Sequence, residues 1–251
     1  MDLLASEWIK ARSIRTTWIL AVGTVVVTVV VSLLGISGLL ADWQAQLPQD
    51  YDPTGISFKG ILVGQILIAT LGAQAFTSEY ATGQIITSLA IVPRRGVLLA
   101  SKTAITVLIA LATAVLTVAG SVGASQAALA AAGLPTADLT DPDAIRALLC
   151  AVGYLVLTAV FGVALGALTR SSSGALAVVV SVGLLVPALA PGLPGVVGEF
   201  AGTYWPTTAG QSSYTIATDG ALTGAAGLAV MAIFTLWTTL AAQLTLKTRD
   251  A

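Results

Sequence analysis

The sequence contains few charged residues and no histidine. Of its 251 residues only 9% are charged, against about 25% in soluble globular domains. Hydrophobic residues make up 56% of the chain, and the mean hydropathy is +0.93. Eleven basic and twelve acidic residues cannot cover the surface of a water-soluble fold of this length, and the apolar residues form long runs. We therefore expect most of the chain to lie in lipid.

The scarcity of reactive residue types excludes several classes of function. The formal net charge is −1 and no basic run exceeds two residues, which argues against nucleic-acid binding. With no histidine and a single cysteine, Cys150, the chain cannot form a disulfide framework or a His/Cys metal site. An intramembrane hydrolase would need a nucleophile with a base, or paired carboxylates. We expect no catalytic, cofactor or metal site on this chain.

Six apolar runs are each long enough to cross a membrane, because about 20 helical residues span a hydrocarbon core of about 30 Å. The predicted spans are residues 17–40, 60–78, 98–126, 145–168, 174–190 and 221–246. Pro187, Pro191 and Pro194 interrupt the fifth run, so we expect residues 187–200 to form a re-entrant or surface-lying outer element. The predicted fold class is all-α, a polytopic membrane protein with a single domain over residues 1–251.

The basic residues predict the orientation. If the N-terminus is cytoplasmic, nine of the eleven lysines and arginines fall on the cytoplasmic side, and only Lys59 and Arg146 fall outside. An excess of basic residues marks the cytoplasmic side of membrane proteins. We expect a multi-pass protein of the cytoplasmic membrane with both termini in the cytoplasm.

The charges within the spans and the residues before the lysines indicate which energy source could drive transport. No predicted span carries a charged residue in its central part, which disfavours a proton-coupled carrier and weakens Na⁺ coupling, although backbone carbonyls alone can bind Na⁺. A P-loop needs glycine directly before its lysine. The four lysines instead follow Ile9, Phe58, Ser101 and Leu246. If transport is driven by ATP, another subunit must bind ATP and Mg²⁺.

The N-terminal residues 1–16 have an amphipathic pattern. Leu4, Trp8 and Ala11 fall on one helical face, whereas Glu7, Lys10 and Ser13 lie elsewhere. This pattern predicts an interfacial helix that runs into the first span. The alternative is a positively charged flank that only orients the first span.

The connection between the second and third spans, residues 79–102, is the other informative segment. Gly83 breaks the helix, and a short apolar patch over residues 85–92 precedes Pro93, Arg94 and Arg95. A patch too short to span and too apolar for a free loop favours a helix that docks a cytoplasmic partner. The alternatives are packing on the membrane surface and arginines that act only as positive-inside anchors.

Three segments resemble the permease subunits of ABC-2 type exporters, which are common in actinobacteria. They are SEWIKARSIRTTW (Ser6–Trp18), TSEYATGQIITSLAIVPRRGVLLASK (Thr77–Lys102) and GVALGALTRSSSGAL (Gly162–Leu176). The middle segment is the most specific. The resemblance covers essentially the whole chain in the number and order of its spans.

This resemblance implies an N-terminal elbow helix, a coupling helix between spans two and three, and short outer helices between spans five and six. The implied elbow residues are Glu7, Trp8, Lys10 and Arg12. The implied ATPase-coupling residues are Glu79, Tyr80, Gly83, Pro93, Arg94 and Arg95. The implied partners are a dimer of separate ATP-binding subunits, a second copy or paralogue of the permease, and membrane lipid.

The predicted function is therefore the permease subunit of an ATP-driven exporter for a hydrophobic or amphipathic substrate such as a drug, antibiotic, lipid or peptide. The alternative is a membrane scaffold or sensor that anchors a cytoplasmic partner without transport. Gln65, Gln74 and Gln126 are the candidate polar groups of a pathway. Hydrogen bonding between helices is their alternative role.

Overall fold

The described part of the chain is helical. A computed structural model describes residues 2–48, 51–91, 94–216, 222 and 224–248, and these residues form helices and turns but no strand. Six helical stretches are long and apolar enough to cross a membrane, which confirms the predicted fold class. They are α2 (Arg15–Ser37), α5 (Ile61–Thr82), α7 (Arg95–Ala131), α8 (Pro142–Thr169), the stretch Ser172–Gly192 and α13 (Gly224–Thr248).

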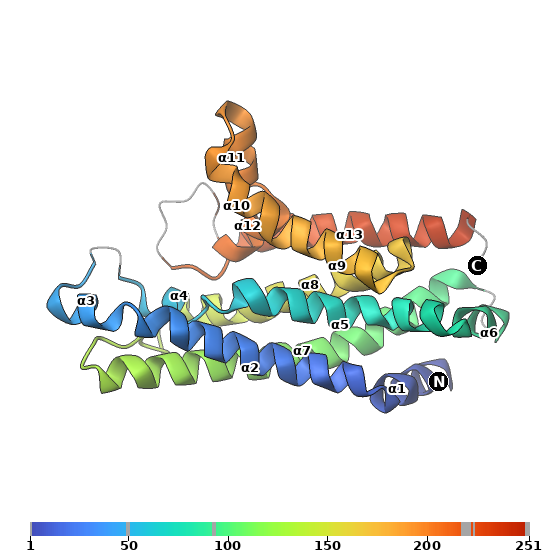
Figure 1. Ribbon diagram of the computed structural model, residues 1–251, viewed down its shortest axis with the longest axis horizontal. Coiled ribbons are helices and arrows are strands. Elements are labelled where there is room, and N and C mark those ends of the chain that lie inside the picture. Colours follow the sequence, from blue (N-terminus) through green and yellow to red (C-terminus); the bar gives the residue numbers. More distant parts are fainter. Residues whose placement is uncertain (1, 49–50, 92–93, 217–221, 223, 249–251) are drawn as a thin grey trace.

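The long helices run along the long axis of the molecule (Figure 1). At one end, which we call the α6 end, lie α1 (Asp2–Ser13), α6 (Gln84–Ile91) and the last turns of α13. At the other, the α3 end, lie α3 (Leu40–Ala45) and α4 (Pro53–Ile56). The first and last described helices therefore reach the same end of the bundle.

The burial of side chains on α2 has the pattern expected in lipid. Its buried positions are mostly small or polar, namely Thr17, Ala21, Thr24, Thr28, Ser32 and Ile36. Large apolar side chains on the same helix point outward, and Ile19 and Leu34 are 66% and 67% exposed. Such a distribution suits a hydrocarbon environment, where small residues let helices approach one another and large apolar side chains face the lipid.

Helices α5 and α8 pack against each other along their length at the centre of the bundle. A Cβ atom at Gly162 would lie 1.9 Å from the carbonyl oxygen of Ala69, and one at Gly166 would lie 2.3 Å from that of Ala73. The sequence Gly162-x-x-x-Gly166 therefore allows backbone-to-backbone contact, a packing role that its spacing predicts.

Helix α7 is longer than predicted, and it ends at a glycine. Gly133 has a φ of +72° and donates its N–H to Ala130, while Leu134 donates to Leu129. These two bonds form a Schellman motif, which satisfies carbonyls at the end of the helix. The helix thus extends past residue 126, where the predicted third span ends, and stops at Ala131.

The predicted fifth span, residues 174–190, lies within the observed stretch Ser172–Gly192, but the outer element that we expected to begin at Pro187 begins later. The helix continues through this proline as α9 (Ser172–Val180), a π-helical turn (Ser181–Leu185), α10 (Val186–Leu189) and a final 3₁₀ turn (Ala190–Gly192). The chain turns only at Leu193 and Pro194. Proline lacks an N–H and leaves a carbonyl of the preceding turn without its helical donor.

Side chains from other helices supply donors to this turn. The indole N–H of Trp205 and the hydroxyl of Thr207 donate to the carbonyl oxygen of Val182 at 2.8 and 3.0 Å. The side-chain amide of Gln65 donates to the carbonyl oxygen of Gly183 at 3.1 Å. The helix thus passes Pro187 because these carbonyls receive side-chain donors.

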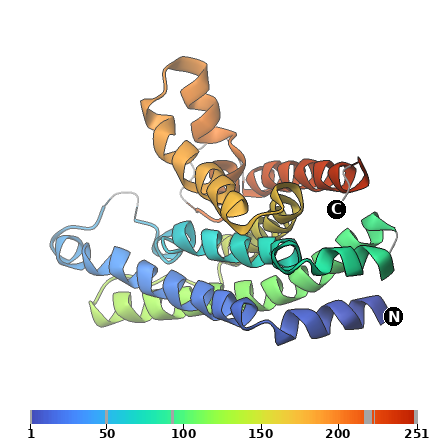
Figure 2. The ribbon, with the colours of Figure 1, turned by 45° about the vertical axis from the view of Figure 1, so that its right-hand side comes forward.

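Two short helices, α11 (Gly195–Thr203) and α12 (Pro206–Ser212), lie between the fifth and sixth spans. Helices α10 and α11 project away from the bundle in both views (Figures 1 and 2). Helix α12 packs back against α13. The predicted outer helical element is therefore present, although it begins after Gly192 rather than at Pro187.

Candidate functional site

Four helices converge at the α6 end, where the sequence predicts the coupling segment. Gly83 adopts a φ of +72° and terminates α5 with its N–H bonded to the carbonyl of Tyr80. Glycine takes this left-handed conformation without steric cost. The resulting sharp turn brings α6 back toward α1, so that residues of α1, α5, α6 and α7 come into contact.

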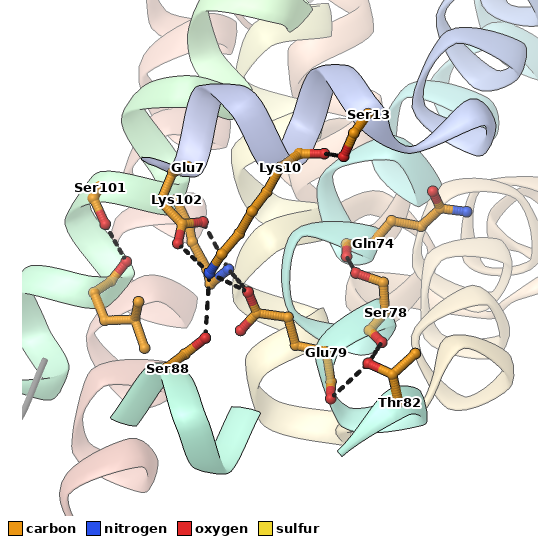
Figure 3. Close-up of polar contacts among 11 residues, drawn as sticks. Glu7, Lys10, Ser13, Gln74, Ser78, Glu79, Thr82, Ser88, Ser101 and Lys102 are labelled. Carbon is orange, nitrogen blue, oxygen red and sulfur yellow. Dashed lines mark hydrogen bonds and ion pairs between the residues drawn. The ribbon is translucent and has the colours of Figure 1, made fainter. Parts of the chain in front are cut away.

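Two acidic and two basic side chains meet at this convergence. We call Glu7, Lys10, Glu79 and Lys102 the ion-pair cluster (Figure 3). The Lys102 ammonium lies 2.8 Å from a Glu7 oxygen and 2.7 Å from a Glu79 oxygen. The Lys10 ammonium lies 2.9 Å from Glu7 and 3.0 Å from the same Glu79 oxygen. Three helices are thereby joined by alternating charges.

The serine Ser88 connects α6 to the cluster. Its hydroxyl accepts a hydrogen bond from Lys10 at 3.3 Å. Lys10 thus directs its ammonium to Glu7, Glu79 and Ser88, three partners on three different helices. A displacement of α6 would act directly on this ammonium.

The cluster is buried on one side and open on the other. The side chains of Lys102, Glu7 and Glu79 are 3%, 5% and 6% exposed, whereas that of Lys10 is 39% exposed. Burial lowers the pKa of Lys10, but its contacts with Glu7 and Glu79 outweigh burial and raise the pKa above the ordinary value. Lys10 therefore stays protonated at neutral pH. The positive charges of the two lysines then balance the negative charges of the two glutamates.

The structure changes the role expected of Glu79. This carboxylate faces into the bundle, where it pairs with two lysines, and it does not reach the surface that a partner could touch. Its other oxygen has no hydrogen-bond partner among the described residues. Glu79 therefore connects helices of this chain.

The other residues expected to couple to an ATPase separate into different environments. Tyr80 packs inside, with the Arg170 guanidinium 5.3 Å from its ring centre. Arg95 is half-buried and donates a hydrogen bond to the carbonyl of Leu246 near the end of α13. Arg94 is exposed. Pro93 lies outside the residues that the structure describes.

The elbow helix α1 packs on the bundle through part of its apolar face and also through Glu7, whose burial the apolar pattern does not predict. Glu7 is its buried residue, while Leu4 is 48% exposed. Trp8 and Ala11 pack beside the buried cluster of Ala21, Leu71 and Ile109, as an apolar face should. Arg12 is exposed, and its carbonyl accepts the Trp18 indole N–H at 3.0 Å. The charged face points inward because Lys102 of α7 provides a buried partner for Glu7 there.

Apolar side chains are exposed on α6. Ile86 is 63% exposed and Ile91 is 75% exposed, while Ile85 and Ser88 are buried. A cavity of about 430 Å³ runs between α1 and α6, with Leu3, Ile91 and Leu98 among its lining residues. The α6 end therefore presents an apolar surface and a groove at the tip of the bundle.

A second cavity, of about 420 Å³, lies beneath α1, and we call it the elbow cavity. The ion-pair cluster forms part of its wall. Leu71, Ile105 and Ile109 contribute apolar surface, and Ser13, Gln74 and Ser78 contribute polar groups. Of the predicted pathway residues, Gln74 is the one that lines this cavity.

Gln65 and Gln126 act between helices. Gln65 is buried and accepts hydrogen bonds from the Tyr154 hydroxyl and, at 3.5 Å, from Gln211. Gln126 donates to the carbonyl of Pro53 at 2.8 Å and accepts from the Ala137 N–H at 2.8 Å. Neither side chain lines the elbow cavity, so the alternative role of interhelical hydrogen bonding describes them better.

Sequence reasoning missed the pairing of Glu7 with Lys102, which lie 95 positions apart in the chain. It also missed Ser88 and the contacts of Tyr154. The sequence signal for the cluster is that Lys102 occurs within the predicted span 98–126, where an ionised group needs a partner.

Comparisons with known proteins agree with the architecture. Residues 3–188 match the family model described as ABC-2 family transporter protein. The match contains α1 from its second residue, α6, the first four spans and most of the fifth, and therefore the whole ion-pair cluster. No curated protein matches the chain.

Proposed function

Because this chain belongs to the ABC-2 family of transporter proteins, we propose that it is the membrane subunit of an ATP-driven exporter for a hydrophobic or amphipathic substrate. The ATP and Mg²⁺ are bound by a separate ATPase subunit that docks at the α6 end, which faces the cytoplasm together with both termini. A second permease copy or paralogue completes the transporter.

The observation that carries this proposal is the connection of α6 to the spans. Helix α6 exposes Ile86 and Ile91, and buries Ser88 against Lys10. A partner bound to the exposed face can therefore move Lys10, and with it the carboxylates of α1 and α5. Exposed apolar surface on a short helix is typical of a protein contact.

The distribution of charge at the α6 end also favours this orientation. The helix ends there carry exposed basic side chains, namely Arg12 at the end of α1, Arg15 at the start of α2, Arg94 before α7 and Lys247 at the end of α13. Glu7 and Glu79 lie at the same end but are buried in ion pairs. A basic surface fits both the cytoplasmic side of a membrane and an acidic surface on an ATPase partner.

The test is co-purification of the chain with the P-loop ATPase encoded by a neighbouring reading frame, followed by ATP turnover in liposomes. Replacing Ile86→Glu places a charge in the proposed contact. We expect it to lower both the amount of bound ATPase and the stimulation of turnover by about tenfold or more.

The matched control is Ile145→Glu, because Ile145 is also exposed but lies at the start of α8, at the α3 end. We expect normal ATPase binding in this variant. Equal ATPase binding by both variants would exclude α6 as the docking helix. An ATPase that binds while no amphiphile moves during turnover would instead favour a non-transporting scaffold.

A further inference from the structure

The elbow cavity lies where two helices of the bundle separate. Near the α3 end α2 and α5 touch closely, because Cβ atoms at Gly60 and Gly64 would lie 1.9 and 2.0 Å from the carbonyl and hydroxyl oxygens of Thr28. The two helices diverge toward the α6 end (Figures 1 and 2). The cavity occupies the resulting wedge, with Thr17 of α2 and Gln74 of α5 on its wall.

The lining of the cavity is amphipathic. Leu71, Ile105 and Ile109 form an apolar part that belongs to the buried cluster beside Trp8. Lys10, Glu79 and Lys102 border the opposite, charged part. A volume of about 420 Å³ falls within the range of ligand sites, roughly 300–1,000 Å³.

The charged part offers little to an anionic ligand. The Lys10 ammonium already donates to Glu7, Glu79 and Ser88. The Lys102 ammonium donates to Glu7 and Glu79 and lies 5.5 Å from the centre of the Phe76 ring. A negatively charged head group would have to compete with two carboxylates for these donors.

Acceptors, by contrast, remain available on the polar part. The hydroxyl of Ser78 donates to the carbonyl of Gln74 at 2.6 Å, and that of Ser13 donates to the carbonyl of Lys10 at 2.8 Å (Figure 3). Both hydroxyl oxygens can still accept a hydrogen bond. The side-chain oxygen of Gln74 is buried and has no partner among the described residues. An unpaired buried acceptor of this kind costs free energy until a donor reaches it.

We propose that the elbow cavity binds a single-chain amphiphile from the membrane, with a head group that donates hydrogen bonds and carries no negative charge. The head group lies beside Gln74 and Ser78, and the alkyl chain lies against Leu71, Ile105 and Ile109. Binding requires only the folded chain in a membrane, so this site can exist whether or not the chain works with an ATPase.

The experiment is photolabelling of the full chain in phosphatidylcholine nanodiscs. One probe is a monoacylglycerol with a diazirine in its alkyl chain, and the matched probe is a fatty acid with the same chain. We expect the monoacylglycerol to label the peptides around Leu71 and Ile105, and to do so about tenfold more than the fatty acid, which lacks the donors and adds a charge.

Two variants locate the site. Ala75→Trp fills the cavity, since Ala75 is on its wall, and should abolish this labelling. Leu62→Trp is the control on the same helix, because Leu62 is exposed and does not line the cavity. Gln74→Leu should remove most of the preference for the monoacylglycerol while the alkyl chain still labels.

Equal labelling by the two probes would overturn the proposal, because it would show that any lipid chain fills the space. Labelling that persists in Ala75→Trp would overturn it as well. If Ala75→Trp does not fold, as judged by its elution in gel filtration, Gln74→Leu decides alone, and an unchanged preference refutes the assigned head group. ATPase binding is not measured in this experiment, so its outcome is separate from that of Ile86→Glu.

Discussion

Near its end, helix α5 contacts its neighbours through the charged side chain of Glu79, whereas near its start it does so through the uncharged amide of Gln65. Glu79 takes part in the ion-pair cluster with two lysines. Gln65 contacts Tyr154, in the middle of α8, and the Gly183 carbonyl of the fifth span, and we call these three groups the Gln65 network. Both arrangements join three helices, but only one uses ions.

The two environments explain this difference. A charged side chain at the centre of a bilayer costs roughly 2.5–3.5 kcal/mol on insertion scales. Tyr154 and Gly183, the partners of Gln65, lie in the middle of their spans, where an uncharged amide suits them better than an ion. At the α6 end the four charges neutralise one another and Lys10 remains in contact with the surroundings. Ion pairs are therefore retained where the ends of the helices approach water.

The largest expected effect is that of Lys102→Ala on the cluster. It leaves the buried carboxylates of Glu7 and Glu79 without their buried cation, and breaking such a pair costs about 3–5 kcal/mol. We expect a marked fall in the thermal unfolding temperature of the purified chain in detergent. In the control, Lys102→Met combined with Glu7→Gln and Glu79→Gln, most of the stability should return. A stable Lys102→Ala variant would show that the cluster does not hold the α6 end together.

A smaller loss is expected from Gln65→Leu in the uncharged network. It removes the partners of the Tyr154 hydroxyl and the Gly183 carbonyl, and an unsatisfied buried group costs about 1–3 kcal/mol. The double-mutant cycle with Pro187→Ala tests the cause, because this second substitution restores a backbone N–H that can donate to the π-helical turn. We expect Gln65→Leu to be less destabilising in that background. If the destabilisation by the two substitutions is strictly additive, the hydrogen bond of Gln65 does not compensate for the proline.

The smallest expected effect is that of Lys10→Gln. Lys10 pairs with the same two carboxylates as Lys102, but its side chain is 39% exposed, and exposed ion pairs contribute only about 0.2–1 kcal/mol. Thermal unfolding should therefore shift little. A loss as large as that of Lys102→Ala would contradict the difference in burial on which the comparison rests.

Several features of the site could be predicted from sequence because their causes are local. Gly83 ends α5 since the turn needs a left-handed residue, and the glycines at 162 and 166 occur at a spacing that permits close helix contact. The direction of α1 could not be predicted in this way. Its apolar residues suggested which face would pack, but the buried position of Glu7 depends on Lys102 of α7.

Pro187 is a second position where local sequence does not predict the structure. Taken alone, a proline in an apolar run predicts the end of a helix. The helix continues because Trp205, Thr207 and Gln65 supply hydrogen bonds to the carbonyls before the proline. These donors come from distant parts of the chain, and the local sequence around residue 187 contains no sign of them.

The sequence by itself determined that the chain lies in lipid, that six segments are long enough to cross it, and that no P-loop is present. Those properties depend on hydropathy, helix length and short-range motifs, which act within one segment. Only the tertiary structure decided that Glu7 and Lys102 pair, that Gln74 lines a cavity while Gln65 does not, and that Pro187 lies inside a helix. Hydrogen bonds and ion pairs act over a few ångströms, so the partner of each polar group depends on which helices the fold brings together.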